Sequence, residues 1–332
     1  MKPSALAVLL AAGVWAGSAV AQPAPLVMKL GTAPVNDSQH QWMKLFAARV
    51  EKGSNGRIKP EIYPGSQLGS IPRMIEGTQF GSIQAFVGPP EFLAGIDTRY
   101  EVLSAPGLFK DLPHANRTLQ DAEFNAAFLA LGASKGLKGV GLFLSGPATF
   151  VTRTPVRKLA EFEGKKVRVA AAALQMEQMR RLRATPVPMS LGEVLPALQQ
   201  GALDGVLSSA PVFTALRFYD AAKYMYESNH AVFTVITVIS KSWYDKLPAD
   251  LQKLVVESGQ KASADVYQWS IDFVAKQRDA WVKGGGELIQ PAAGERAQLM
   301  KMMLPIGAEV TSKKPGEKAM FELLQKAVKR TE

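Results

Sequence analysis

Cysteine is absent from this 332-residue sequence, and histidine is scarce. The missing cysteines exclude disulfides, thiolate metal sites, iron–sulfur clusters, cysteine nucleophiles and a lipid-modified N-terminal cysteine. The histidines, His40, His114 and His230, are separated by gaps that match no zinc-ligand spacing. We therefore expect neither a metal site nor a bound cofactor.

Catalytic signatures are missing as well. No expected strand is followed by G-x-S-x-G, H-E-x-x-H, G-x-x-x-x-G-K-[ST] or G-x-G-x-x-G at the start of a helix, which removes the common hydrolase, protease and nucleotide-binding motifs. The acidic residues Glu161 and Glu163 lie beside two lysines in an expected turn. We interpret them as solvated side chains rather than a glycosidase pair. Nothing in these patterns indicates an enzyme.

Long hydrophobic runs are confined to the N-terminus. Lys2 precedes an apolar run at 5–16, and Ala19-Val20-Ala21 has the small-x-small form of a cleavage site. The run is shorter than the roughly 18 residues of a membrane-spanning helix. We interpret residues 1–21 as a secretory signal peptide cleaved after Ala21; a short N-terminal anchor is the alternative.

Basic residues exceed acidic ones, with 39 Lys and Arg against 29 Asp and Glu and a formal net charge of +10. Nucleic-acid binding requires basic residues gathered on one face with aromatic residues between them, and here they are scattered. The densest cluster, at 180–183, lies in an expected helix beside Glu177. We expect no nucleic-acid partner, but a positive field attracts small anions or an acidic membrane partner.

Hydrophobic periodicity indicates an α/β protein with two lobes. Apolar strands and amphipathic helices alternate over 26–87 and again over 139–207, which predicts parallel, helix-covered sheets. The β-branched segment 231–239 is predicted to be a strand connecting the lobes. A helical pattern runs from Pro248 to the glycines at 284–286, and at about 1.5 Å per residue its length, about 50 Å, is enough to bridge both lobes.

The expected organisation follows from these patterns, because a chain of this length divides into more than one compact unit. We divide it into a signal peptide at 1–21, a first lobe at 22–145, a second lobe at 146–230, a hinge strand with its return to the first lobe at 231–247, the long bridging helix at 248–283 and a C-terminal segment at 284–332 that packs on both lobes.

One charged residue lies where a charge is costly. Arg168 alternates with Val167 and Val169 in an expected strand, so its side chain faces the side opposite to theirs. An arginine buried there needs an anion for its donors, and a carboxylate can bind it in bidentate fashion. The residues alone leave two interpretations open, a ligand site and a structural ion pair.

Several motifs, in order along nearly the whole mature chain, resemble the solute-binding proteins of tripartite ATP-independent periplasmic (TRAP) transporters, in the C4-dicarboxylate and sialate-binding branch. They are VEKGSNGRI at 50–58, YPGSQLG at 63–69, GKKVRV at 164–169, ATPVPM at 184–189, EV at 193–194, ALQQGALDG at 197–205 and LPADLQK at 247–253. The resemblance implies a periplasmic protein whose two lobes close on an organic acid and deliver it to the small and large subunits of a sodium-driven permease.

The resemblance also implies site residues. In the family, the arginine of the G-x-K-x-R-V strand forms a salt bridge with the ligand carboxylate, and that position is Arg168 here. The position after the Q-G-x-x-D-G turn, which adds a hydrogen bond to the ligand, matches Ser208, and its neighbour Ser209 could serve equally. Ala171 follows the arginine strand and is a further candidate.

Departures from the family pattern point to a less polar ligand. An acidic pocket residue of sialate-binding members falls near Gly88 in this sequence, a second pocket arginine falls near Pro147, and Thr32-Ala33 stands where those members have asparagine. A hydroxyl-rich sugar acid would leave hydrogen bonds unmade. We predict a monocarboxylate with an apolar or aromatic body, and the alternative is a C4-dicarboxylate or another hydroxy or keto acid. The candidate walls are Phe86, Leu191, Phe213 and Trp42, for which ordinary core packing is the other interpretation.

Two further function classes stay open at this stage. A related binding protein could present its ligand to a membrane sensor kinase instead of a permease. A periplasmic enzyme on the same fold would need a titratable pair facing Arg168, and His230 is the histidine nearest an expected inter-lobe segment. We expect a binding protein and a monomer, although apolar residues on the long helix could also form a dimer seam.

Overall fold

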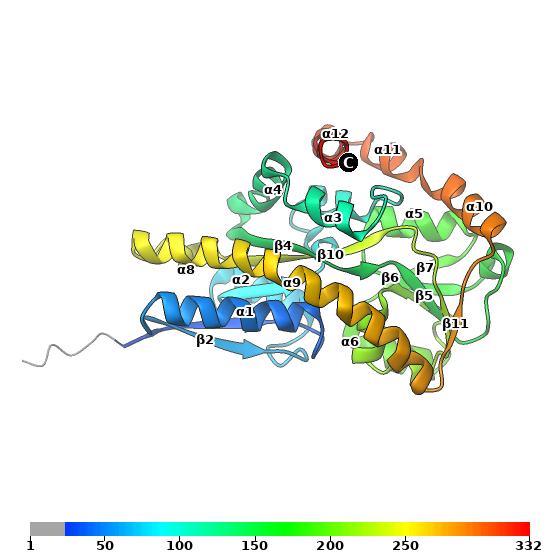
Figure 1. Cartoon of the computed structure of the whole chain (residues 1–332), viewed down its shortest axis with the longest axis horizontal. Coiled ribbons are helices and arrows are strands. Elements are labelled where there is room, and N and C mark those ends of the chain that lie inside the picture. Colours follow the sequence, from blue (N-terminus) through cyan, green and yellow to red (C-terminus); the bar gives the residue numbers. More distant parts are fainter. Residues whose placement is uncertain (1–23) are drawn as a thin grey trace, which may run out of the picture.

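The computed structural model describes residues 24–332, so the proposed signal peptide and its cleavage site lie outside the described residues. Figure 1 shows two β-sheets with helices around them and one long helix running past both. The strands are β1 Leu26–Gly31, β2 Ile58–Tyr63, β3 Ala85–Gly88, β4 Leu137–Pro147, β5 Thr149–Thr152, β6 Lys166–Val169, β7 Thr185–Pro188, β8 Gly205–Ser208, β9 Tyr224–Tyr226, β10 Val232–Ser240 and β11 Glu287–Ile289. The α-helices are α1 Ser38–Gly53, α2 Ile71–Phe80, α3 Leu112–Leu119, α4 Ala122–Leu129, α5 Ala173–Arg181, α6 Leu191–Gln199, α7 Ala210–Ala215, α8 Lys241–Tyr244, α9 Ala249–Lys283, α10 Ala293–Met303, α11 Ile306–Thr311 and α12 Pro315–Arg330.

Both sheets are mixed. The first has the order β2-β1-β3-β10-β4 and the second the order β11-β9-β5-β8-β6-β7. Strand β1 is parallel to β2 and β3, as the alternation of strands and helices predicts, whereas β10 is antiparallel to both of its neighbours. In the second sheet β6 is parallel to β7 and β8, and β5 is antiparallel to β8 and β9. These two helix-flanked mixed sheets confirm the predicted two-lobed α/β fold.

The chain crosses between the sheets at a few defined places. Strand β4 ends at Pro147 in the first sheet and β5 begins at Thr149 in the second, with Ala148 between them. The return runs from β9 to β10 through residues 227–231. Residues that connect two sheets by single extended segments are suited to act as hinges, because few backbone torsions need to change.

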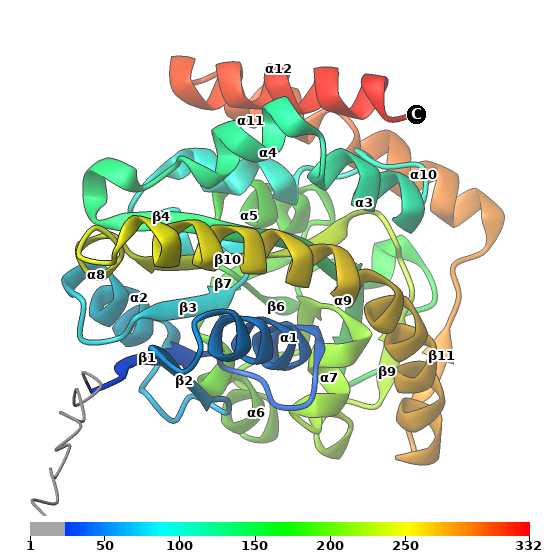
Figure 2. The ribbon, with the colours of Figure 1, turned by 60° about the vertical axis from the view of Figure 1, so that its left-hand side comes forward.

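Helix α9 is the third connection, and it packs against α1 and β4 of the first lobe and α7 and β11 of the second. Its 35 residues correspond to a length of about 50 Å, and Figure 2 shows it passing over both sheets. Gly259 permits its close approach to β4, because a Cβ there would lie 2.1 Å from the carbonyl oxygen of Val140. The long lobe-bridging helix of the predicted fold is therefore present.

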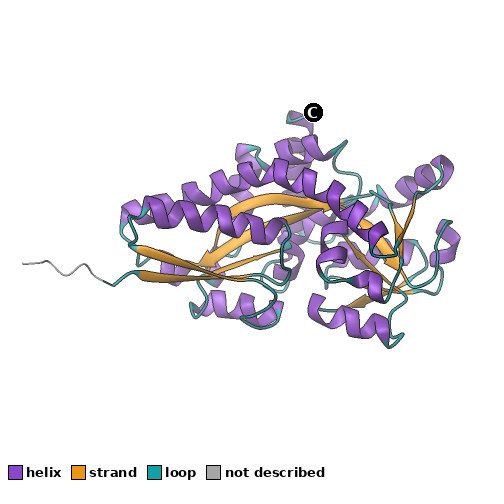
Figure 3. Cartoon of the chain, turned by 60° about the horizontal axis from the view of Figure 1, so that its bottom comes forward, coloured by secondary structure: helices purple, strands orange, loops and turns teal. Residues whose placement is uncertain are grey.

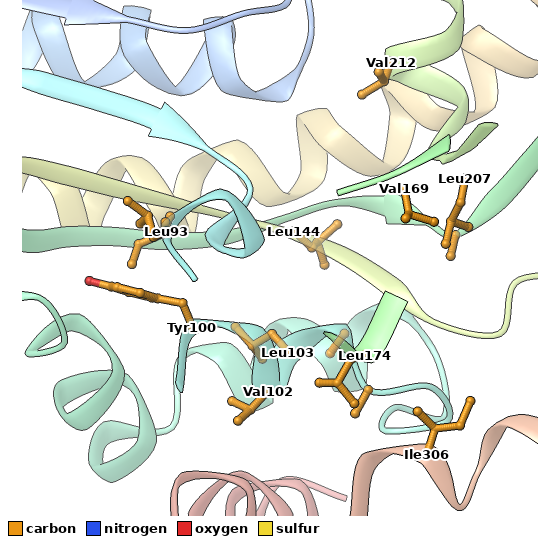
Figure 4. Packing of buried hydrophobic residues seen from close by; sticks show 14 of the residues in the cluster. Leu93, Tyr100, Val102, Leu103, Leu144, Val169, Leu174, Leu207, Val212 and Ile306 are labelled. Atoms are coloured by element: carbon orange, nitrogen blue, oxygen red, sulfur yellow. The ribbon is translucent and has the colours of Figure 1, made fainter. Parts of the chain in front are cut away.

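The main hydrophobic core continues from one sheet to the other. Figure 4 shows Leu93 and Leu144 from the first lobe in the same cluster as Val169 and Leu207 from the second. A second cluster lies between the first sheet and helices α1 and α9, and a third lies beneath α6 and α7. This packing across the sheets stabilises the arrangement of the lobes seen here through buried apolar area.

Helical segments that the periodicity did not reveal enclose the strands, as Figure 3 shows. Helices α3 and α4 fill the stretch before β4, and α12 packs on both of them. Helices α10 and α11 contact α5 of the second lobe, so the C-terminal segment contacts both lobes. Within residues 24–332, no helix has the length and apolar character needed to cross a bilayer.

Candidate functional site

A small cavity lies between the two sheets, where strands of both lobes end. Because the carboxyl ends of strands in α/β sheets leave loops that converge, ligand sites form there. Residues from β4, β6, β8 and β10 and from the segments that follow β1, β3 and β7 surround about 20 Å³, space for one or two water molecules. The lining residues are Gln39, Pro89, Glu91, Phe92, Ser145, Arg168, Ala170, Gln175, Leu191, Ser208, Ser209, Val212, Phe233 and Thr234.

Arg168 enters this cavity from β6. Val167 and Val169, on the other face of the strand, are fully buried in the core, and Arg168 itself is 3% exposed. Its Nε and Nη2 both donate to the carbonyl oxygen of Met189, at 2.9 and 2.7 Å. These bonds fix the plane of the guanidinium group and leave Nη1 without a hydrogen bond to any of residues 24–332.

No carboxylate forms an ion pair with Arg168 among the residues that the structure describes. Burial lowers the pKa of Arg168 to about 10, and the negative charge of Glu91 acts in the opposite direction, so the side chain remains a cation at neutral pH. The ring of Phe92 lies with its centroid 5.8 Å from the guanidinium carbon, a cation–π distance. The structure thus contains a buried, oriented cation that lacks a direct anionic partner.

Glu91 is the acidic side chain of the cavity, and it lies in a 3₁₀ turn, Pro90–Leu93, directly after β3. It is 2% exposed. Its Oε1 accepts hydrogen bonds from Ser104 Oγ at 2.6 Å and from Gln175 Nε2 at 3.3 Å, whereas Oε2 is buried without a partner. Burial raises the pKa of Glu91, while the two hydrogen bonds and the charge of Arg168 oppose that rise.

A chain of buried polar groups leads from Glu91 towards the crossing between β9 and β10. Gln175 Oε1 accepts from the amide of Ala170 at 2.9 Å, which ties α5 to the end of β6. Gln178 donates to the carbonyl of Ser104 at 2.8 Å and contacts His230 Nε2 at 3.0 Å. Each bond satisfies a group that burial would otherwise penalise.

His230 belongs to this series of hydrogen-bonded polar groups and does not line the cavity. Its Nδ1 lies 2.8 Å from Ser228 Oγ, and its ring stacks on Phe150 with centroids 5.5 Å apart. Burial lowers the pKa of His230 to about 4, so the ring is neutral at neutral pH. An enzyme would need a pair of titratable groups facing Arg168, and His230 is not one of them. The titratable group beside Arg168 in the cavity is Glu91.

Hydroxyl groups also line the cavity, from β8 beside β6 and from the first sheet. Ser208 ends β8, and Ser209 precedes α7 with its Oγ 3.4 Å from Ser145 Oγ. Thr234 Oγ1, on β10, is buried without a hydrogen-bond partner. Together with Arg168 Nη1 and Glu91 Oε2, these hydroxyls give the cavity several polar atoms whose bonds within the protein are incomplete.

The structure brings four of the sequence-predicted site residues to this cavity: Arg168, Ser208, Ser209 and Leu191. Phe86 and Gly88 lie on β3 and do not line it. A Cβ at Gly88 would lie 2.4 Å from Phe86 Cζ, so the phenylalanine ring occupies the space above this glycine and packs in the main core. At this strand end, glycine accommodates an aromatic ring of the core.

The other predicted residues also lie elsewhere. Phe213 packs in the third cluster, with its ring centroid 6.2 Å from that of Trp281. Trp42 stacks on Phe46 and Phe143 in the second cluster. Ala33 is buried within the main core, and Ala171 is exposed.

Ten of the fourteen lining residues were not predicted from the sequence, among them Glu91, Phe92, Gln175 and Phe233. Glu91 had one recognisable signal, an acidic residue within the apolar stretch Pro89-Pro90-Glu91-Phe92-Leu93 directly after a buried strand. The others look like ordinary loop, helix or strand residues in the sequence. Within residues 24–332 no cluster of three or more His, Asp or Glu is arranged to hold a metal ion.

Comparison with known proteins adds the family context of this geometry. The family model described as bacterial extracellular solute-binding protein, family 7 (DctP), matches residues 31–314. The 2,3-diketo-L-gulonate-binding periplasmic protein of Escherichia coli is 29% identical over 227 residues, covering 68% of this chain and 69% of that protein. The C4-dicarboxylate-binding periplasmic protein of Rhodobacter capsulatus is 26% identical over 295 residues, covering 87% of each.

Solved structures share the fold. A TRAP periplasmic solute-binding protein from Desulfovibrio salexigens with bound orotic acid superposes with a TM-score of 0.87 and 24% identity, covering 92% of this chain and 99% of that one. A second, from Xanthobacter autotrophicus with bound β-D-galacturonate, has a TM-score of 0.82 and 26% identity, covering 90% and 99%. The likeness extends over nearly all of the described chain.

Proposed function

The chain belongs to family 7 of the bacterial extracellular solute-binding proteins, the periplasmic binding proteins of TRAP transporters, and we propose that it captures an organic acid through a salt bridge from Arg168 and delivers it to a TRAP permease. The relatives are named for 2,3-diketo-L-gulonate and C4-dicarboxylates, and the solved structures hold orotic acid and galacturonate. All of these are organic acids, which supports the same ligand class here.

The observation that carries the proposal is the unpaired, oriented cation in the cavity. Arg168 is 97% buried, its Nε and Nη2 are held by Met189, and Nη1 is free to bind. A ligand carboxylate would supply the missing anion and the missing acceptor together. Neutral analogues would leave the charge buried without compensation, so the site should reject them.

Lobe movement is part of the proposal because of the size of the cavity. About 20 Å³ is far below the roughly 300 Å³ of small ligand pockets. An organic acid therefore requires the lobes to part along the crossings at Ala148 and at 227–231 before they close on it. Closure removes water from the salt bridge and strengthens it.

The walls support an acid with an apolar or aromatic body. Phe92, Leu191, Val212 and Phe233 form much of the lining, and polar groups gather around Arg168 and Glu91. The carboxylate would lie at the polar end and the body against the apolar side chains. A hydroxy or keto acid is the alternative that the hydroxyls of Ser208 and Thr234 favour.

A thermal-shift screen of residues 22–332 against small organic acids and their matched amides tests this proposal. Ligand that binds only the native state raises the melting temperature by mass action. We expect a concentration-dependent rise with at least one acid and a much smaller rise with its amide, which binds more weakly. A rise that is equal for acid and amide, or no rise with any acid after unfolding and refolding to release co-purified ligand, would contradict the assignment.

A further inference from the structure

Glu91 is not used by the carboxylate salt bridge, and its position demands another explanation. A ligand carboxylate at Arg168 adds negative charge to a cavity that already contains a buried glutamate. Like charges in a low-dielectric site repel strongly. A buried carboxylate oxygen without a hydrogen bond is also costly by itself, most of all when the group is charged.

The hydrogen bonds of Glu91 are distributed unevenly. Ser104 and Gln175 both donate to Oε1, and Oε2 has no donor within residues 24–332. The positive charge of Arg168 favours the ionised form of Glu91, and in that form the free oxygen can only accept a hydrogen bond. The residue that carries this oxygen lines the cavity beside Arg168.

We propose that Glu91 Oε2 accepts a hydrogen bond from the ligand, so that the ligand of this protein is an acid that carries a hydroxyl or ammonium donor near its carboxylate. This inference rests on the proposed function, because it assumes that Arg168 binds that carboxylate. The two side chains then select the ligand jointly: Arg168 requires an anion, and Glu91 requires a donor. Fatty and aryl acids without a donor would leave Oε2 without a hydrogen bond. A second carboxylate on the ligand would be repelled by the negative charge of Glu91.

Charge balance separates the two kinds of donor. A hydroxyl leaves the closed cavity with one net negative charge, since Arg168 is positive and both Glu91 and the ligand carboxylate are negative. An ammonium group pairs with Glu91 and leaves the cavity neutral, which lowers the penalty of burying the charges. The shared requirement is a donor, and the experiment distinguishes its two sources.

The test is isothermal titration calorimetry with probes of matched skeleton. One set is 3-phenyllactate, phenylalanine and 3-phenylpropionate; the other is 2-hydroxy-4-methylpentanoate, leucine and 4-methylpentanoate. In the unmodified protein we expect a donor-bearing member of at least one set to bind at least about tenfold more tightly than the member without a donor, because a site built for a donor rejects the analogue that lacks it. Equal affinity within both sets overturns the inference.

Variants assign this preference to Glu91. Glu91→Leu should abolish the tenfold advantage, and an advantage that persists would overturn the inference. Glu91→Gln preserves the shape and an acceptor oxygen: it should keep part of a hydroxyl's advantage and lose an ammonium's. The matched control is Glu101→Gln, a buried carboxylate outside the cavity that accepts from the amide of Ala173 at 2.7 Å; it should leave the preference unchanged.

The thermal-shift screen and the calorimetry together distinguish a failure of the inference about Glu91 from a failure of the proposed function. If dicarboxylates or keto acids without a donor shift the melting temperature and none of the six probes binds, the inference about Glu91 fails and the proposed function survives. If no acid of any kind binds, both fail.

Discussion

Two buried glutamates of this molecule have very different surroundings. Glu227 is 7% exposed, and both of its oxygens are bonded: Arg278 donates from Nε at 2.5 Å and from Nη2 at 2.9 Å, and Gln290 adds a third bond at 3.0 Å. Glu91 is 2% exposed, has one free oxygen, and shares its cavity with an arginine that forms no ion pair within the described chain.

This difference distinguishes a structural ion pair from charged groups that are available to bind a ligand. A complete pair such as Glu227 with Arg278 satisfies its own charges, and its role is to join the end of β9 to α9. An incomplete set, a cation and an anion that face one cavity without bonding each other, lacks its partners within residues 24–332, as expected for a site that binds a ligand. Perturbed, unpaired charges in a cleft are therefore better evidence for a ligand site than the mere presence of a buried arginine.

The largest expected effect comes from Arg168→Met, which removes the cation with little change in volume. Affinity for the acid identified by the thermal-shift screen should fall at least about 30-fold, or about 2 kcal/mol, the loss of a buried charge-assisted pair. The free energy of unfolding should change by only about 1 kcal/mol, because removing a buried cation without a direct ionic partner offsets the loss of its two hydrogen bonds to the carbonyl of Met189. Calorimetry and urea unfolding measure the two quantities, and intact affinity would end the interpretation of Arg168 as an anchor.

The complementary change, Arg278→Met, should show the reverse behaviour. It leaves Glu227 buried with only Gln290 as a donor, so the free energy of unfolding should fall by about 1–2 kcal/mol, a value reduced because Arg278 is partly exposed. Arg278 does not line the cavity that contains Arg168, and ligand affinity should stay unchanged. A loss of affinity without a loss of stability would remove the contrast between the two arginines.

His230 extends the comparison to a buried group whose two ring nitrogens are hydrogen-bonded while the ring is neutral. Its pKa is about 4 in the folded protein and about 6.5 when unfolded, so the unfolded state binds the extra proton as the pH falls below about 6.5. Stability from this group is complete above pH 6.5 and is lost on acidification, by about 2 kcal/mol between pH 7 and pH 5. In urea unfolding at both pH values, His230→Gln should lose less stability than the unmodified protein, and equal losses would contradict the buried neutral ring.

The smallest effects come from two buried threonines that repeat the comparison without charge. Thr32 Oγ1 donates to Gln39 at 2.9 Å, whereas Thr234 Oγ1 has no partner. Replacing Thr32 by valine should lower the free energy of unfolding by about 1 kcal/mol, and the same change at Thr234 should cost less than about 0.5 kcal/mol or stabilise. Equal costs in thermal unfolding would mean that Thr234 is bonded in solution.

The sequence allowed much of the fold to be predicted because strong local signals marked it. Alternating strands and helices indicated the parallel pairing of β1 with β2 and β3, and Pro248 with the glycines at 284–286 bounded the long helix. The segments that became α3, α4 and α11 were not predicted, because they span only six to eight residues each and do not stand out in the sequence. Their helical state depends more on packing against neighbouring elements than on local propensity.

The cavity was predictable only in part. Arg168 was recognisable because a charge between two valines in a short strand has few explanations. Glu91 was not predicted, because its one local signal, an acidic residue in an apolar stretch after a strand, does not show that this loop of the first lobe meets β6 of the second. Phe86 and Phe213 show the converse error, since a buried aromatic side chain looks the same in the sequence whether it faces a cavity or the core.

The proposed function depends most on the salt bridge between Arg168 and a ligand carboxylate, and a thermodynamic cycle measures that salt bridge directly. Calorimetric affinities of the bound acid and of its amide are compared in the unmodified protein and in Arg168→Met. The account predicts that the acid loses about 30-fold or more while the amide changes little, so the two losses differ by about 2 kcal/mol or more. If acid and amide lose affinity equally, Arg168 does not bind the ligand carboxylate, and the proposed salt bridge is wrong.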